Sequence, residues 1–75
     1  MTLWDLSKNA SARVSGYSPA MHSSIQTRLQ EMGFAIGAHI VCTKRSPFGG
    51  PLVILVQDCV YSLERSLAEG IEVKV

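Results

Sequence analysis

The sequence predicts a mainly β protein, a small and strongly bent barrel of about five strands with one α-helix inserted after the first strand. Several short apolar segments rich in β-branched residues are separated by Gly, Pro and Asp, as strands and turns are. One segment near the middle changes to a helical period. The chain has 75 residues, and a closed barrel is an economical way to remove most exposed edges from so few strands.

The N-terminal part predicts one helical turn and one strand. Residues 2–5 read Thr-Leu-Trp-Asp, the Thr-x-x-Asp form of a capping box, which favours a short helical turn. In residues 10–15, small and apolar side chains alternate, with Ala12 and Val14 on one face. We expect this segment to be the first strand and residues 16–19 to end it.

Residues 23–32 predict the α-helix. Ile25, Leu29 and Met32 follow one another at i, i+4 and i+7, which places them on one helix face. Either of the two serines that open the segment can cap its N-terminus. Gly33 stands where a left-handed residue ends a helix.

The second half of the chain reads as strands. The apolar, β-branched segments predict strands at 38–45, 52–57, 60–63 and 71–75. Residues 46–51, with two prolines around a Gly-Gly pair, predict a loop, and residues 58–59 predict a tight turn. A single helical turn is expected at 64–68, ended by Gly70.

Composition favours one compact domain over residues 1–75 that binds rather than catalyses. The chain is 47% hydrophobic and 17% charged, with a net charge of +1. Nucleic-acid binders usually carry a strong basic bias, which is lacking here. No spacing brings a Cys to a His, and the Gly-Gly loop lacks the phosphate-binding lysine pattern. We therefore expect no enzyme and no cofactor.

The N-terminus and the cysteines indicate a cytoplasmic protein. The first residues lack the basic and apolar regions of a secretory signal. No apolar run approaches the roughly 20 residues that cross a bilayer, so no membrane insertion is expected. Cys42 and Cys59 are therefore expected to be free thiols.

The spacing of possible ligands does not predict a metal site. These ligands are His22, His39, Cys42 and Cys59. His39 and Cys42 are three apart on a predicted strand, so their side chains point to opposite faces. If the loop at 46–51 closes its hairpin symmetrically, Cys42 lies opposite Leu55, away from the turn that carries Cys59. Cys42 is expected to be a small apolar residue of the sheet.

Two segments resemble the ferrous iron transport protein A (FeoA) family. Residues 28–37 read Arg-Leu-x-x-Met-Gly-Phe-x-x-Gly, similar to the helix end and turn of that family. Residues 40–51 read Ile-x-Cys-x-x-Arg-Ser-Pro-Phe-Gly-Gly-Pro and resemble its hairpin with a Pro-x-Gly-x-Pro loop. Leu63 and the closing Ile71-x-Val73 fit its last turn and strand. The resemblance covers nearly the whole chain.

The resemblance implies an SH3-like barrel, a cytosolic location and a partner. The partner is the membrane Fe²⁺ transporter, ferrous iron transport protein B, which has its own cytosolic GTPase domain. A regulatory or assembly role towards this transporter is the usual assignment for the family.

The sequence departs from the family pattern at three positions. Asp58 stands where the family often has Gly, and Val53 and Leu55 stand where an outward polar residue is common. The strand at 52–57 is therefore apolar on both sides. Either Val53 and Leu55 lie beneath Trp4, the helix or a curled strand, or they form an outer surface that pairs with another copy or with the transporter.

The candidate partner-binding residues are Lys44, Arg45, Phe48, Val53 and Leu55. A second hypothesis is a small-barrel nucleic-acid-binding module that uses the hairpin at 44–51. Lys44 and Arg45 would then contact phosphate, and Phe48 would stack on a base.

Overall fold

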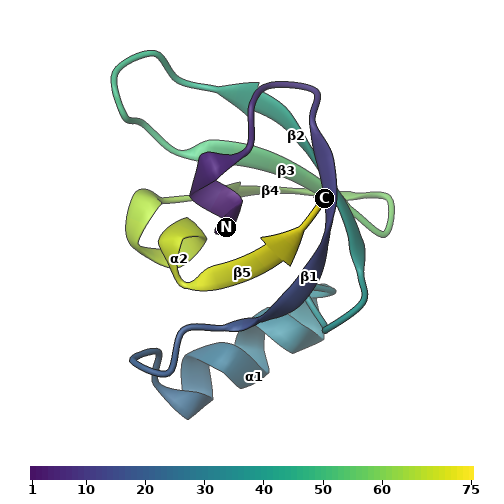
Figure 1. Cartoon of the computed structure of the whole chain (residues 1–75), viewed down its shortest axis with the longest axis vertical. Coiled ribbons are helices and arrows are strands. Elements are labelled where there is room, and N and C mark those ends of the chain that lie inside the picture. The colour runs from purple at the N-terminus through teal and green to yellow at the C-terminus, as the bar shows by residue number, and fades with distance from the viewer.

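A computed structural model describes residues 1–75 as one strongly curved, five-stranded antiparallel sheet in the order β4-β3-β2-β1-β5 (Figure 1). The elements are η1 (Leu3–Asp5), β1 (Ser11–Tyr17), α1 (Ser23–Met32), β2 (His39–Arg45), β3 (Leu52–Val56), β4 (Cys59–Leu63), α2 (Arg65–Glu69) and β5 (Ile71–Lys74). The predicted fold class, five strands with one main helix after the first, is confirmed.

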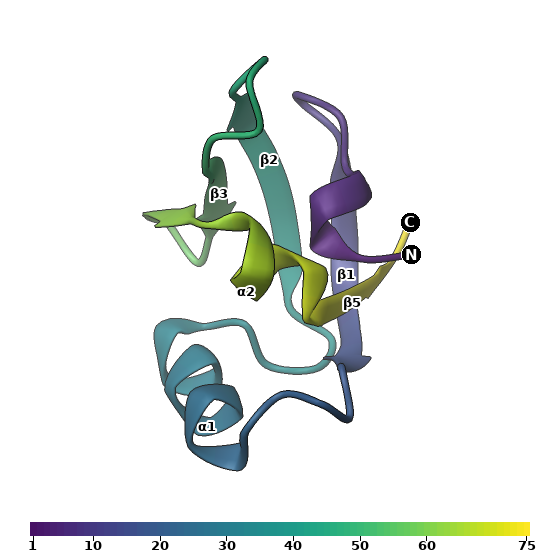
Figure 2. The same cartoon turned by 90° about the vertical axis from the view of Figure 1, so that its left-hand side faces the viewer.

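The core fills the concave side of the sheet. η1 and α2 lie on the open side of the curved sheet, and α1 lies at one end of it (Figure 2). The fifteen core residues are Leu3, Leu6, Ala12, Val14, Leu29, Phe34, Ile40, Cys42, Leu52, Ile54, Val56, Leu63, Ala68, Ile71 and Val73. None of them is polar or charged, so burial of apolar surface is the main source of stability.

The first strand runs further than predicted. The expectation that Gly16 ends it was wrong, because β1 continues to Tyr17 and pairs there with β5. A register shift between Val14 and Gly16 bends the strand at the point where it leaves β2 for β5. The hydroxyl of Tyr17 donates a hydrogen bond to the carbonyl of Phe34, and burial raises the pKa of this tyrosine.

The predicted helix is confirmed, but its cap differs. His22 is the N-cap, and its Nδ1 accepts from the backbone N–H of Ser24 at 3.1 Å, so neither serine caps the helix. Gly33 ends it with a φ of 114°, in the region that favours glycine. Of the predicted apolar face only Leu29 is fully buried, and Ile25 is 40% exposed. Neither helix is long and apolar enough to cross a membrane.

The capping box predicted at residues 2–5 is present. The backbone N–H of Thr2 donates to Oδ2 of Asp5 at 2.8 Å, and this bond is the main reason why the pKa of Asp5 lies below its usual value.

The tight turn between β3 and β4 is formed by Gln57 and Asp58, with φ values of 49° and 64°, one residue earlier than predicted. These angles belong to a type I′ turn, the two-residue hairpin connection that matches strand twist.

Candidate functional site

A bulge at Thr43 determines which way the residues before the β2–β3 loop point. Near the loop, Arg45 pairs with Leu52 and Lys44 with Val53, but the next pair is Cys42 with Ile54. Thr43 is therefore an extra residue, and its hydroxyl donates to the carbonyl of Val53 at 3.1 Å. The symmetric hairpin that placed Cys42 opposite Leu55 was wrong, because a bulge shifts the register by one residue.

Lys44 and Arg45 point to opposite sides of the sheet, as consecutive strand residues do, and the bulge puts Lys44 on the opposite side from Cys42. Lys44 lies on the convex side with its partner Val53, whereas Arg45 shares the side of the buried Leu52. Partners in an antiparallel pair point to the same face, which makes this assignment independent of side-chain rotamers. The two basic residues of the predicted contact set therefore do not form one cluster on one face.

Arg45 holds the N-terminal segment to the hairpin. Its guanidinium donates to the carbonyl oxygens of Trp4 at 2.5 Å and of Leu6 at 3.0 Å. The same group lies 4.8 Å from the centroid of the Trp4 ring, in cation–π geometry. Arg65 of α2 also packs on this ring, at 5.3 Å, and pairs with Glu69 at 3.1 Å. Arg45 therefore has a structural role besides any role in binding.

Phe48 stands at the tip of the β2–β3 loop and is 95% exposed. Keeping a phenylalanine in water gives up the burial free energy of its side chain, about 1.5–3 kcal/mol. Gly49 next to it adopts a φ of 74°, which glycine tolerates without strain and which completes the turn. An aromatic side chain presented in this way is typical of a contact residue.

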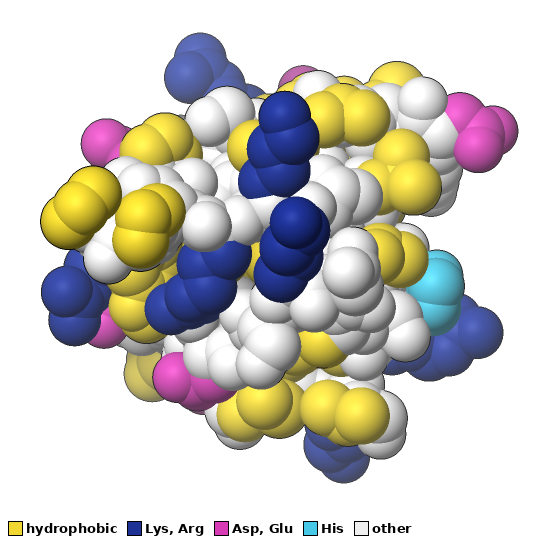
Figure 3. Space-filling model, turned by 90° about the horizontal axis from the view of Figure 1, so that it is seen from above, with side chains coloured by type: hydrophobic (Ala, Val, Ile, Leu, Met, Phe, Trp, Pro, Cys, Tyr) yellow, Lys and Arg dark blue, Asp and Glu magenta, His cyan; other side chains and the backbone are white.

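Basic side chains surround the base of this loop. We call the loop and its surroundings the hairpin end, comprising Lys8, Lys44, Arg45, Phe48 and Arg65. Lys8 belongs to it because the neighbouring Asn9 N–H donates to the Cys42 carbonyl beside the bulge. In Figure 3, which views the molecule from the top of Figure 1, several Lys and Arg side chains lie close together in the middle of the face. Four of the seven Lys and Arg residues of the chain thus belong to one end.

Val53 and Leu55 point outward from the convex side of the sheet and are half-buried. Their strand partners are Lys44 and Ser62 for Val53, and Val41 and Val60 for Leu55. The side chains of the other face, Leu52, Ile54 and Val56, fill the core. Between the two hypotheses for this strand, the structure thus favours an outer apolar surface over burial beneath Trp4 or the helix.

Replacing Val53 and Leu55 together by glutamate should leave the protein folded. Both side chains keep solvent access, so the new carboxylates stay hydrated and cost far less than charges in the core. Thermal unfolding followed by circular dichroism should remain one cooperative transition. Loss of cooperative unfolding in this variant would mean that the two side chains belong to the core.

The possible metal ligands are dispersed over the molecule. Cys42 is fully buried in the sheet, and burial raises the pKa of its thiol. His39 is exposed, so the two side chains point to opposite faces as predicted. Cys59 is exposed at the start of β4, and both cysteines are free. No three His, Cys, Asp or Glu side chains gather in a ligating cluster.

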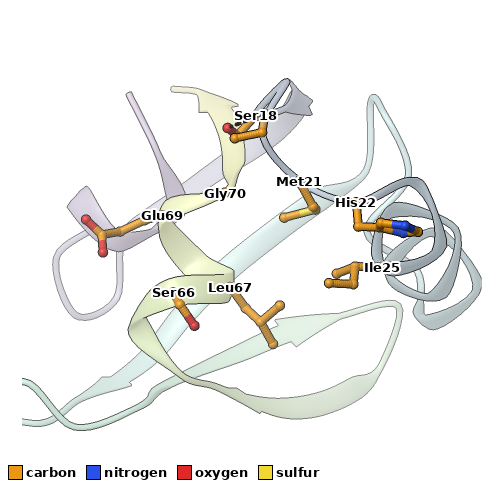
Figure 4. A pocket seen from close by; sticks show the side chains of 9 residues that line it. Ser18, Met21, His22, Ile25, Ser66, Leu67, Glu69 and Gly70 are labelled. Carbon is orange, nitrogen blue, oxygen red and sulfur yellow. Dashed lines mark hydrogen bonds between the residues drawn. The ribbon is translucent and has the colours of Figure 1, made fainter.

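An apolar groove between α1 and α2 was not predicted from the sequence. Met21 and Ile25 on one side and Leu67 on the other point into it (Figure 4). Its volume is about 470 Å³, and an adjoining hollow of about 370 Å³ continues along α1 and shares Ile25 and Leu67. The only signal in the sequence was the apolar helix face that begins at Ile25.

Known proteins share this fold along the whole chain. The sequence model of the FeoA domain matches residues 1–75, whereas a comparison with curated proteins finds no match. FeoA from Chlorobium tepidum is 27% identical with a TM-score of 0.88, over 100% of this chain and 70% of that one. Iron(II) transport protein A from Clostridium thermocellum is 28% identical with a TM-score of 0.89, over 100% of this chain and 45% of that one.

A third structure is described in functional terms. FeoA from Stenotrophomonas maltophilia, solved in complex with zinc, is 30% identical with a TM-score of 0.86, over 99% of this chain and 89% of that one. It is described as a prokaryotic SH3 domain protein and as a candidate activating factor of bacterial ferrous iron transport. The resemblance inferred from the two sequence segments is confirmed by these comparisons. The chain belongs to the FeoA domain family.

Proposed function

We propose that this protein is a cytoplasmic, non-enzymatic accessory factor of bacterial ferrous iron uptake that binds the membrane transporter ferrous iron transport protein B. The family and the description of the Stenotrophomonas maltophilia relative support a role in ferrous iron transport. The observation that carries the contact hypothesis is Phe48, an aromatic side chain 95% exposed at the tip of a loop with basic residues at its base.

The chemistry of the hairpin end indicates what it would bind. An aromatic ring gains most free energy in a pocket from which water is excluded. The basic side chains around it favour an acidic rim and steer the approach of such a partner. We therefore propose that the transporter's cytosolic region offers an apolar pocket bordered by Asp and Glu. Val53 and Leu55 extend the contact along the convex side, next to Lys44.

The nucleic-acid hypothesis receives less support from the same geometry. Phosphate binding requires guanidinium groups that are free to approach the backbone of the nucleic acid. Arg45 instead donates to the carbonyls of Trp4 and Leu6, and Arg65 pairs with Glu69. Lys8, Lys44 and Phe48 remain at the hairpin end, and they are too few for a single-strand platform.

The test is a titration of the protein into the soluble GTPase domain of the transporter from the same organism, with and without a GTP analogue. We expect saturable binding that weakens as salt is raised, because the proposed contact is partly electrostatic. Full-length transporter in detergent should be titrated in parallel, since the contact can involve its membrane region. Absence of binding to both forms would refute the transporter as partner.

Variants at the hairpin end should locate the contact. Phe48→Ala truncates a central contact residue and Lys44→Glu reverses a charge that faces the proposed acidic rim, so each is expected to weaken binding about tenfold or more. The matched controls are Ile36→Ala, an apolar residue 68% exposed in the turn before β2, and Lys74→Glu on β5. If the controls weaken binding as much as the hairpin variants do, the hairpin end is not the contact.

A further inference from the structure

The sheet has one edge that nothing covers. At the β5 edge, the N–H of Val73 donates to the carbonyl of Met1 at 2.9 Å, and Thr2 forms a bridge with Glu72. The N-terminal residues thus protect that edge. At the opposite edge, β4 pairs with β3 on one side, and no other helix or strand lies alongside it.

The tight turn before β4 determines which backbone groups are free. In a two-residue type I′ hairpin the residues next to the turn form a hydrogen-bonded pair, and the pairs then alternate along the strands. Val56 and Cys59 are that first pair, so Cys59, Tyr61 and Leu63 bond to β3. The N–H and C=O groups of Val60 and Ser62 therefore point away from the sheet. Neither residue forms a hydrogen bond elsewhere in the protein.

This edge lacks the devices that usually prevent strand pairing. Exposed edges in natural proteins carry lysines, prolines, bulges or a covering element. β4 reads Cys-Val-Tyr-Ser-Leu, without a charge or a proline, and its pairing with β3 has no register shift. Val60, which is 63% exposed, ends an outward row that crosses the sheet from Val41 through Leu55. Both the backbone and the side chains of β4 thus favour pairing with a further strand at this edge.

We infer that β4 pairs antiparallel with β4 of a second copy of this chain, so that two sheets join into one. With Tyr61 at the symmetry axis, Val60 faces Ser62 of the partner subunit and Ser62 faces the partner's Val60. Every free N–H and C=O group of these residues then has a partner in both copies. No charge opposes a like charge within the paired strands, since Cys59–Leu63 contains none.

Self-pairing explains why a second copy fits better than an unrelated segment. The free groups of β4 lie symmetrically about Tyr61, so the strand is complementary to its own antiparallel copy. Across the axis, the row that ends at Val60 meets Ser62 of the partner subunit and, beyond it, the partner's Val53. A five-residue strand contributes an interface below the roughly 1,200–2,000 Å² of stable complexes, so the dimer is expected to be weak and to dissociate on dilution.

The test combines sedimentation velocity with amide hydrogen exchange on the purified full chain. We expect the dimer fraction to rise between about 10 µM and about 1 mM, the range of a weak interface. The amides of Val60 and Ser62 should exchange fast in dilute samples and slowly in concentrated ones. Val60→Lys and, separately, Ser62→Lys should remain monomeric over the same range. Ile36→Lys, on an apolar side chain of similar exposure, should dimerise like the wild type.

Three outcomes would overturn the inference. One is a protein that stays monomeric at all concentrations. Another is a dimer that does not use this edge: either the amides of Val60 and Ser62 stay unprotected in it, or it still forms in both lysine variants. The third is protection of these two amides only after the transporter's GTPase domain is added, which would assign the edge to a strand of the transporter. Circular dichroism of each variant separates loss of pairing from loss of fold.

Discussion

Replacing Phe34 by alanine is expected to lower the free energy of unfolding by about 3–5 kcal/mol, the usual cost of truncating a buried aromatic residue. Phe34 is fully buried, and its ring centroid lies 5.7 Å from that of Tyr61 across the core. Its carbonyl also accepts the hydrogen bond from Tyr17. Removing the ring therefore leaves a cavity where β1, β4 and the segment after α1 meet. A domain of this size has about 4–11 kcal/mol of stability in total.

Urea unfolding followed by circular dichroism measures this loss. The matched control is Phe48→Ala, the same chemical change at a side chain that is 95% exposed. That variant should change the unfolding free energy by less than about 0.5 kcal/mol, as surface substitutions do. Equal losses in the two variants would contradict the assignment of Phe34 to the core and Phe48 to the surface.

Replacing Arg45 by alanine is expected to cost about 1–3 kcal/mol, although the residue is exposed. The substitution removes two hydrogen bonds from a charged donor to the carbonyls of Trp4 and Leu6, and leaves those carbonyls to water. It also removes the cation from the Trp4 ring. The N-terminal segment should loosen first, because Arg45 ties it to the hairpin.

Two further variants separate this effect from a general effect of charge. Lys44→Ala, at the neighbouring position on the convex side, should be nearly neutral in stability. Arg45→Lys should fall between wild type and Arg45→Ala, since one ammonium group cannot reproduce the planar guanidinium stacked on Trp4. Exchange of the amides of residues 3–6 should accelerate most in Arg45→Ala, less in Arg45→Lys and not in Lys44→Ala. If Lys44→Ala were as costly as Arg45→Ala, the bulge would not orient the two residues as described.

Much of the fold could be predicted because local patterns determine it. The helical period ending at Gly33 predicted the bounds of α1, and alternating apolar residues located each strand within about two residues. The type I′ turn was predicted one residue late, because Asp58 belongs to the residue types that favour left-handed geometry whereas Gln57, which adopts a φ of 49°, does not. Gly16 was read as a strand breaker, whereas in the barrel it marks the bend next to a bulge.

The candidate site was harder to predict because it depends on contacts distant in sequence. Nothing near Thr43 indicates a bulge, which forms because the curved sheet needs a bend there. The bulge changes the pairing partner of Cys42, and the bonds of Arg45 to residues about forty positions earlier depend on contacts that no local pattern shows. The exposure of Phe48 could be anticipated from its Pro- and Gly-rich loop. The groove between α1 and α2 arises from the packing of two separate helices.

The central claim is that the protein promotes ferrous iron uptake through the hairpin end, and uptake in cells tests it most directly. The initial rate of Fe²⁺ uptake should be measured in cells of the source organism that lack the gene. These cells should then carry either the wild type or Phe48→Ala combined with Lys44→Glu, at equal protein levels. We predict that uptake is reduced without the gene, is restored by the wild type and is not restored by the double variant. Equal uptake with and without the gene would contradict the role in iron transport, and full restoration by the double variant would contradict the hairpin end as the contact.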